Sequence, residues 1–320
     1  MISILLPFRN EEVYIKTCID SIRNQTHTNW ELLAVDDHST DGSPQIVQDY
    51  AAADSRIHYI KNPGRGVIHA LKTAHDNSRG TYLSRMDADD YKSPDNLASL
   101  MALANKGTLV LGQVKYFRED GLGEGYAKYE TWINDVNREG RSWDEVYREC
   151  VVPSPCWLAH RDDFQACGGF DSPLYPEDYD LCFRFYRQGL TVRCTPNIIH
   201  FWRDHAIRTT RVSPHYADNR FTHLKVQYFF EIDRRTNQNL VLVGGGKKGK
   251  AVARMMQEFE PNFTWLTNNP NKVGHVIYDI TMQDLDTYPF RDEEQVIIAV
   301  TGADESILNT HTNPDTYCFF

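Results

Sequence analysis

The sequence predicts an α/β protein built on a mostly parallel sheet with flanking helices. The run ISILLPF at 2–8 is almost entirely apolar, as expected of a parallel strand that is buried on both faces. In the segment that follows, Tyr14, Cys18 and Ile22 recur at helical spacing and share one face. Strand-like and helix-like segments then continue to alternate, which is typical of βαβ units.

The same alternation justifies each element up to residue 117. Ser-Pro pairs at 43–44 and 93–94 indicate helix starts, because proline is pre-organised for the first helical turn. The predicted strands are, in chain order, 2–8, 30–37, 56–60, 81–86 and 108–117. The predicted helices follow the first four of these strands, and they begin near residues 14, 44, 66 and 94.

The next hundred residues carry a weaker pattern. Three closely spaced glycines after residue 120 indicate a loop. The remaining predicted elements are short helices at 129–137 and 142–150, helices at 160–170 and 176–189, and two short strands within 191–202. A helix near 215–235 then precedes a fresh strand, glycine loop and helix. We therefore expect domains at 1–212 and 237–320, joined by a helical linker at 213–236.

Composition and charge exclude several classes of protein. The chain has 34 basic and 44 acidic residues, a formal charge of −10, which argues against a nucleic-acid-binding surface. No apolar run approaches the roughly 20 residues that span a bilayer, and the first residues lack the basic start of a signal peptide. The seven cysteines are scattered, which indicates reduced thiols in a cytoplasmic protein.

Acidic residues gather where predicted strands end or helices begin. In an open α/β sheet, ligands bind beyond the carboxyl ends of the strands. Adjacent carboxylates repel, so a cluster there calls for a positive partner, and a hard divalent cation suits oxygen ligands. The three clusters are Asp36/Asp37, Asp87/Asp89/Asp90 and Glu177/Asp178/Asp180.

Five stretches in family order resemble the family 2 glycosyltransferases, which have the nucleotide-sugar-binding GT-A fold. They cover about residues 1–212 and read SILLPFRNEE, VDDHSTDGS, RMDADDYKSPDNL, GGFDSPLYPEDYDLCFR and FWRDHAIRTTR. The resemblance implies an inverting, metal-dependent enzyme that moves a sugar from a nucleotide sugar, expected to be a UDP-sugar, to a saccharide or lipid-linked glycan acceptor. It also implies a role in surface-polysaccharide assembly, in the cytoplasm or peripherally at the inner face of the membrane.

The resemblance implies that RMDADD binds Mg²⁺ or Mn²⁺. In the family's D-x-D motif the second acid, here Asp89, coordinates the metal, and Asp87 contacts the ribose or the metal side. His205 is a further metal ligand, a diphosphate contact or a structural histidine. We expect Asp90 to turn away and cap the next helix.

Other matched positions are expected to bind the donor. Asp37 matches the acid that recognises the base, since a carboxylate can accept a hydrogen bond from an imide N–H. The first loop lines the nucleotide pocket, although Arg9 could equally pair with its acidic neighbours. Arg65 and Arg85 contact the diphosphate or nucleotide, or instead lay their stems along apolar surface. The residues assigned to the donor are Pro7, Arg9, Glu11, Asp37, Arg65, Arg85 and Asp87.

Asp178 matches the family's catalytic base. Inversion needs a carboxylate that removes the acceptor's proton from the face opposite the leaving group. The first turn of a helix favours an anion, so we expect Asp178 to be ionised at neutral pH, although an acid there can also be a simple cap. The residues expected to orient the base or shape the sugar and acceptor pocket are Glu177, Trp157, Gly168 and Gly169.

The C-terminal segment carries a second glycine signal. VLVGGGKKGKA satisfies G-x-G-x-x-G through Gly244, Gly246 and Gly249. The next strand ends in Thr267 and two asparagines and lacks the acid that binds ribose in dinucleotide sites. This segment resembles the small Rossmann-like domain behind some family 2 transferases. We expect a packing or oligomerisation domain, with regulatory nucleotide binding as the open alternative.

Three other functions agree less well with the sequence. A nucleotidyltransferase would want a basic, glycine-rich first loop, and LLPFRNEEVY is acidic without glycine. A nucleotide-sugar-binding or sensing protein would not need intact acids at Asp37, Asp87, Asp89 and Asp178. An oxidoreductase lacks the ribose acid.

Overall fold

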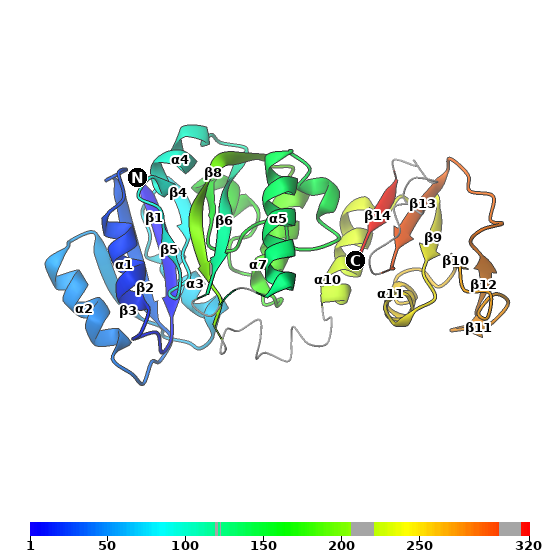
Figure 1. Ribbon diagram of the computed structural model, residues 1–320, viewed down its shortest axis with the longest axis horizontal. Helices are drawn as coiled ribbons and strands as arrows, with labels where there is room; N and C mark the ends of the chain where they lie inside the picture. The colour runs from blue at the N-terminus through cyan, green and yellow to red at the C-terminus, as the bar shows by residue number, and fades with distance from the viewer. Residues whose placement is uncertain (119–120, 122, 206–220, 301–314) are drawn as a thin grey trace. The chain divides into compact units, whose positions relative to one another are not determined.

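The computed structural model describes residues 1–118, 121, 123–205, 221–300 and 315–320. The chain divides into two compact units (Figure 1). Unit 1 comprises Met1–Trp143 and Cys150–Arg211, and unit 2 comprises Asp144–Glu149 and Val212–Phe320. The predicted linker at 213–236 falls inside unit 2 in this division. Residues 144–149 also belong to unit 2, which nothing in the local sequence predicts.

Unit 1 is an α/β structure on an eight-stranded sheet with the order β3-β2-β1-β4-β7-β6-β8-β5. The strands are β1 Ile2–Phe8, β2 Trp30–Asp36, β3 Ile57–Lys61, β4 Tyr82–Arg85, β5 Tyr91–Lys92, β6 Thr108–Phe117, β7 Trp157–His160 and β8 Thr191–Arg203. The helices are α1 Ile15–Arg23, α2 Ser43–Ala53, α3 Val67–Asp76, α4 Asn96–Leu103, α5 Glu124–Arg138, α6 Arg161–Ala166 and α7 Glu177–Arg187. The predicted fold class is confirmed.

The sheet is mixed, because β7 and β5 run against their neighbours. β1 pairs in parallel with β2 and β4, and β6 pairs in parallel with β8. β7 is antiparallel to both β4 and β6, so β6 and β8 run in the same direction as β4. The carboxyl ends of β1, β2, β4 and β8 therefore lie at one edge of the sheet. Residues far apart in sequence, such as Asp87 and His205, can meet there.

Two local predictions differ from the structure. The weak pattern after residue 120 forms one helix, α5, which includes Gly125, and only Trp143–Glu145 of the expected second helix forms, as a 3-10 turn. The two short strands expected within 191–202 are one strand, β8, whose register on β6 shifts after Leu111. Gln113 Nε2 donates to the carbonyls of Thr195 and Pro196 at 3.1 and 2.8 Å, which accommodates that irregularity.

Alternating side chains of the central strands build the core of unit 1. Ile2, Ile4 and Leu6 are fully buried on one face of β1, where they contact a cluster that includes Ile15 and Ile19 of α1. Burial of this kind contributes about 1.5–3 kcal/mol per large apolar side chain. The core fixes the strand ends, and the strand ends position the candidate site.

Unit 2 has a six-stranded sheet with the order β11-β12-β10-β9-β13-β14. Every pairing in it is parallel except that of β11 with β12. Its elements are α10 Phe221–Tyr228, the π-turn η2 Phe229–Asp233, β9 Asn239–Val243, α11 Lys247–Met256, β10 Thr264–Thr267, β11 Val276–Ile277, β12 Ile280–Asp284, β13 Glu294–Ile298 and β14 Thr316–Cys318. Within the described ranges, no helix is long and apolar enough to cross a bilayer.

Residues 144–149 are part of the core of unit 2. Val146 and Tyr147 are 0% and 3% exposed. The Tyr147 ring stacks on Phe319 with centroids 5.3 Å apart, and its hydroxyl donates to Asp233 Oδ2 at 2.6 Å. Lys225 Nζ donates to the carbonyl of Arg148 at 2.7 Å. A segment between α5 and β7 is thus held by side chains from the C-terminal part of the chain.

Candidate active site

The loops after β1 and β2 are joined by hydrogen bonds. The backbone N–H of Glu11 donates to Ser43 Oγ at 2.7 Å, and Thr40 N–H donates to Asn10 Oδ1 at 2.8 Å. Asn10 has a φ of 57°, a conformation that asparagine tolerates better than most residues. Of the predicted donor residues on the first loop, Pro7 and Glu11 are half-buried and Arg9 is exposed.

Asp37, the predicted base-recognising acid, is buried and already has partners. Its Oδ1 accepts hydrogen bonds from Asn62 Nδ2 at 2.7 Å and from Gly66 N–H at 3.0 Å. Its Oδ2 also lies 3.0 Å from Gly66 N–H. Asp37 therefore holds the loop between β3 and α3 against the end of β2. A role in base recognition stays a prediction, with Oδ2 as the oxygen that has fewer partners among the described residues.

The two predicted donor arginines lie in different surroundings. Arg65 is exposed on the loop before α3. Arg85, at the end of β4, is buried, and it donates from Nε to Asp87 Oδ1 and from Nη1 to Glu177 Oε1, both at 2.9 Å. Burial alone would lower the pKa of Arg85, but Asp87, Glu177 and Asp178 outweigh it and raise the pKa above its usual value. Arg85 is therefore a charged link between the D-x-D loop and the start of α7.

Asp89 and His205 meet at the carboxyl edge of the sheet. His205 Nε2 lies 3.0 Å from Asp89 Oδ2, although 116 residues separate them. The side chain of His205 is 14% exposed, that of Asp89 is 18% exposed and that of Asp87 is 27% exposed. His205 also lies against Tyr14, with ring centroids 5.4 Å apart. The structure therefore brings together two of the three residues predicted to bind metal, Asp89 and His205, while the Asp87 side chain contacts Arg85.

Negative charge is concentrated at this edge. Burial is the first cause that raises the pKa of Glu11, to about 8, and the carboxylates of Asp89, Asp41 and Asp87 add to it. Glu11 is therefore the residue of the first loop most affected by the D-x-D acids. A cation among these carboxylates would lower the pKa of Glu11 and so oppose the effect of the three aspartates.

The residues present fit a divalent cation that is shared with a ligand. Nowhere in the described ranges do three or more His, Cys, Asp or Glu side chains form a group able to hold a metal by themselves. One oxygen of Asp87 accepts a hydrogen bond from Arg85. The groups that remain as possible metal ligands are the other oxygen of Asp87, the carboxylate of Asp89 and the imidazole of His205. Among the described side chains, His205 Nδ1 is a buried nitrogen without a hydrogen-bond partner. Such a donor set is incomplete without oxygens from a bound diphosphate.

Asp90 does not cap the following helix, and that expectation is wrong. Its carboxylate is 2% exposed and faces β8, where Oδ2 lies 2.9 Å from His200 Nε2 and Oδ1 accepts from Arg203 N–H at 2.8 Å. The residue before α4 is Asp95, which makes no side-chain cap. Asp90 is thus a partner of a strand that lies 110 residues later in the chain.

Asp178 lies in the first turn of α7, as predicted, but its pKa is higher than full ionisation at neutral pH would require. Burial, and then the neighbouring carboxylate of Glu177, raises the pKa of Asp178 to about 7, while Arg85 and the N–H of Tyr179 oppose the rise. That N–H donates to Asp178 Oδ1 at 2.8 Å. The helix terminus alone contributes too little to offset the loss of solvent. A carboxyl group with a pKa near 7 suits a base at neutral pH.

The turn after α6 is fixed by a buried arginine of α7, Arg184. Gly168 and Gly169 have φ values of 83° and 50°, and a Cβ on Gly169 would lie 3.1 Å from the Phe164 ring. Arg184 Nη1 donates to the carbonyls of Cys167 and Gly169 at 2.8 and 2.7 Å. The two glycines therefore satisfy a backbone requirement of this turn. Their role beside the acceptor stays a prediction.

Trp157 does not fit its predicted role of shaping the sugar and acceptor pocket. Its side chain is 1% exposed and stacks on Phe164, with centroids 5.8 Å apart. Phe185 of α7 lies at the same separation on another side of the indole. Trp157 is a core residue behind α7.

The glycine loop of unit 2 is explained by close packing. Gly244 has a φ of 128°, and a Cβ there would lie 2.8 Å from the carbonyl oxygen of Ala299. A Cβ on Gly249 would overlap the Gly244 carbonyl, whereas Gly246 has open space around it. Trp265 Nε1 donates to the Gly244 carbonyl at 2.9 Å. The motif thus builds a tight strand-to-helix turn, and nucleotide binding at this loop is not proposed.

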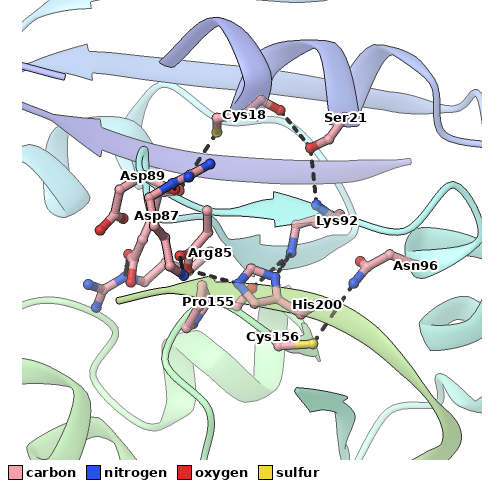
Figure 2. A network of polar contacts seen from close by, with 12 residues as sticks. Cys18, Ser21, Arg85, Asp87, Asp89, Lys92, Asn96, Pro155, Cys156 and His200 are labelled. Atoms are coloured by element: carbon pink, nitrogen blue, oxygen red, sulfur yellow. Dashed lines mark hydrogen bonds and ion pairs between the residues drawn. The ribbon is translucent and has the colours of Figure 1, made fainter. Parts of the chain in front are cut away.

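Sequence reasoning missed the residues that support the D-x-D loop from behind. Lys92 and His200 are buried and in contact with one another (Figure 2), and Arg203 Nε donates to the carbonyl of Asp89 at 2.8 Å. From the α1 side, Cys18 Sγ lies 3.7 Å from the carbonyl of Asp87. Nothing in the sequence around Lys92, DDYKSPD, predicts its burial, which results from the pairing of β5 with β8.

Comparison with known proteins identifies relatives of this chain. Residues 3–168 match the family model described as glycosyl transferase family 2. The uncharacterized glycosyltransferase EpsJ of Bacillus subtilis (strain 168) is 34% identical over 234 residues, 71% of this chain and 67% of EpsJ. EpsH of the same strain is 27% identical over 219 residues, 64% of this chain and 61% of EpsH. The chain therefore spans less than two thirds of the length of EpsH.

Solved structures share the fold. The 1–349 fragment of TarS from S. aureus in complex with UDP-GlcNAc superposes with a TM-score of 0.55 and 15% identity, over 81% of this chain and 71% of that one. The mannosyltransferase PcManGT from Pyrobaculum calidifontis in complex with GDP-Man and Mn²⁺ gives a TM-score of 0.53 and 20% identity, over 72% of this chain and 63% of that one. At these identities the likeness shows the GT-A fold alone.

Proposed function

The chain belongs to glycosyltransferase family 2, and from this premise we propose that it is an inverting, metal-dependent transferase of a sugar from a nucleotide sugar. The donor is a UDP-sugar, and the acceptor is a hydroxyl of a saccharide or lipid-linked glycan. The TarS structure with UDP-GlcNAc supports a UDP-sugar donor, and the PcManGT structure with Mn²⁺ supports a metal cofactor.

One observation carries the proposal. The Asp89–His205 pair and Asp178 lie on separate parts of the chain, yet Arg85 joins their surroundings through its two 2.9 Å contacts with Asp87 and Glu177. A donor diphosphate and an acceptor must be held at a fixed separation for in-line displacement. A buried arginine between the two acidic motifs is suited to fix that separation.

The proposed chemistry is a single displacement. Asp178 accepts the proton of the acceptor hydroxyl, whose oxygen forms a bond to the anomeric carbon as the bond from that carbon to the diphosphate breaks. The products are the glycoside, a nucleoside diphosphate and protonated Asp178. Mg²⁺ or Mn²⁺, held by Asp89, His205 and the second oxygen of Asp87, would supply positive charge to the leaving diphosphate. Glu177 stays paired with Arg85, so it positions Asp178 and does not take the proton.

The remaining assignments belong to the same proposal. Asp37 and the first loop, including Pro7, Arg9 and Glu11, face the nucleotide, and Arg65 is available to the diphosphate. The setting is the cytoplasm, at the inner face of the membrane when the acceptor is lipid-linked. Unit 2 serves packing or oligomerisation.

A nucleotide-sugar panel tests the proposal. Turnover is measured with Mn²⁺ and with chelator for wild type, Asp89→Asn and Asp178→Asn. The control is Asp162→Asn, since that exposed acid pairs with Lys106 away from the site. We expect one UDP-sugar to be consumed with Mn²⁺, and both site variants to lose at least about a hundredfold in rate, the scale of one general base. Full turnover by Asp178→Asn would assign the base elsewhere.

A further inference from the structure

Behind the D-x-D loop lies a chain of three buried ionisable side chains. Lys92, His200 and Asp90 are 3%, 0% and 2% exposed. Lys92 Nζ donates to the carbonyl of Pro155 at 2.8 Å and lies 3.5 Å from His200 Nδ1. His200 Nε2 lies 2.9 Å from Asp90 Oδ2. Charged side chains are almost never buried without partners, and here each one contacts the next. Figure 2 shows Lys92 beside His200.

The direction of these hydrogen bonds follows from chemistry. A carboxylate only accepts, so the hydrogen of the imidazole lies on Nε2 and points at Asp90. Nδ1 is then an acceptor, and the Lys92 amine donates to it. Lys92 therefore favours the tautomer that Asp90 requires. These three side chains connect β5 to β8, and Lys92 also connects β5 to the segment before β7.

This row of buried side chains ends at the candidate metal ligands. Asp90 directly follows Asp89 and accepts from Arg203 N–H at 2.8 Å. Arg203 lies two residues before His205, and its Nε donates to the carbonyl of Asp89 at 2.8 Å. Asp90 and Arg203 thus couple the two backbones that present Asp89 and His205.

The backbone alone ties β5 to β8 weakly, although β8 itself pairs with β6 up to Arg203. The β5–β8 ladder has only two residue pairs, Tyr91 with Phe201 and Lys92 with His200. An apolar trio of similar volume would fill the space without the cost of desolvating charges. Stability alone therefore does not explain why this position holds a lysine, a histidine and an aspartate.

We propose that Lys92, His200 and Asp90 are positioning residues that hold Asp89 and His205 at the separation needed to share one divalent cation. This inference rests on the proposed function, because it takes Asp89 and His205 as metal ligands. It goes beyond that function by placing the control of metal affinity in a buried chain that contacts neither metal nor substrate. Residues that orient metal ligands in this way typically change metal affinity 10–100-fold when removed.

A matched pair of substitutions tests the proposal in the full chain. Lys92→Met removes the donor to His200 and keeps the volume. Gln113→Met is the control, because Gln113 is also buried and, as Lys92 does to Pro155, donates to backbone carbonyls, here two in β8. Bound Mn²⁺ is measured by electron paramagnetic resonance in the presence of UDP, and Tm is recorded for each variant. We expect both variants to lower Tm, and only Lys92→Met to weaken Mn²⁺ binding, by about tenfold or more.

A second pair guards against misfolding of Lys92→Met. His200→Gln keeps an N–H donor for Asp90 and an acceptor for Lys92, whereas His200→Leu keeps neither. We expect Gln to retain Mn²⁺ affinity within about threefold and Leu to lose about tenfold or more. Equal Mn²⁺ affinity across Lys92→Met, His200→Leu and Gln113→Met would overturn the positioning role. If Asp89→Asn also bound Mn²⁺ as wild type does, the proposed function itself would fail.

Discussion

At the scale of single residues, the ionisation of Asp178 governs the proposed chemistry. Its pKa is raised to about 7, first by burial and then by Glu177. Only the deprotonated form can accept the acceptor's proton, so the active fraction rises with pH through this pKa. The sequence locates Asp178 correctly but not its pKa, because the loss of solvent around α7 is produced by the whole fold.

The pH dependence of kcat should follow this group. We expect kcat to increase about tenfold per pH unit below pH 7 and to level off above it, as for one ionisation. The measurement is kcat against pH at saturating donor, acceptor and Mn²⁺. A kcat that stays flat from about one pH unit below to about one pH unit above this pKa would show that Asp178 is not the base.

The same pKa makes a prediction about stability. In the unfolded chain an aspartate has a pKa near 3.9, so the folded protein favours protonated Asp178. Ionisation therefore opposes folding, with a penalty that is absent below about pH 4 and complete above about pH 7. We expect Asp178→Asn to raise Tm at about pH 8, with the gain shrinking toward pH 4. A constant difference in Tm across this range would contradict the raised pKa.

At the scale of elements, the site depends on contacts between strand ends and helix starts. Asp87, Asp89 and Asp178 were predictable because each lies in a short motif at the end of a strand or the start of a helix. Asp90 was not, because its partners, His200 and Arg203, lie on β8 more than a hundred residues later. Arg85 was predicted as a donor contact, and only the structure shows its two carboxylate partners.

The Arg85 link should be strongly stabilising in its present form. Arg85→Met leaves the buried Glu177 carboxylate without its cation, and breaking a buried pair in this way costs about 3–5 kcal/mol. We expect urea unfolding to show that loss for Arg85→Met. The double variant Arg85→Met/Glu177→Gln should recover at least half of it, since the unpaired charge is removed. If the double variant lost as much stability as Arg85→Met and Glu177→Gln lose together as single variants, the contact between Arg85 and Glu177 would not be the source of the effect.

At the scale of the whole molecule, the two units are not simple consecutive segments. Residues 144–149 lie between the two segments of unit 1 in the sequence, but they belong to unit 2. A local pattern cannot reveal this, because Tyr147 looks like an ordinary helical residue until Phe229 and Phe319 are placed against it. The strand, glycine loop and helix at 239–256 were predictable because they follow from local periodicity.

Substitution of Tyr147 should therefore weaken distant strands. We expect Tyr147→Ala to cost about 3–5 kcal/mol, as for other large aromatic truncations in cores. Hydrogen exchange should speed up in β9, β13 and α10. The control is Trp132→Ala, in α5 of unit 1, which should leave exchange in those elements unchanged. Unaltered exchange after Tyr147→Ala would mean that the segment is not part of that core.

The most direct test of the central claim is the binding of UDP, measured by calorimetry with Mn²⁺ and with chelator. The account predicts that wild type binds UDP with Mn²⁺, and that both chelator and Asp89→Asn weaken this binding by about a hundredfold, the scale of removing metal-mediated charge at a diphosphate. Equal UDP affinity with and without the metal would contradict the account.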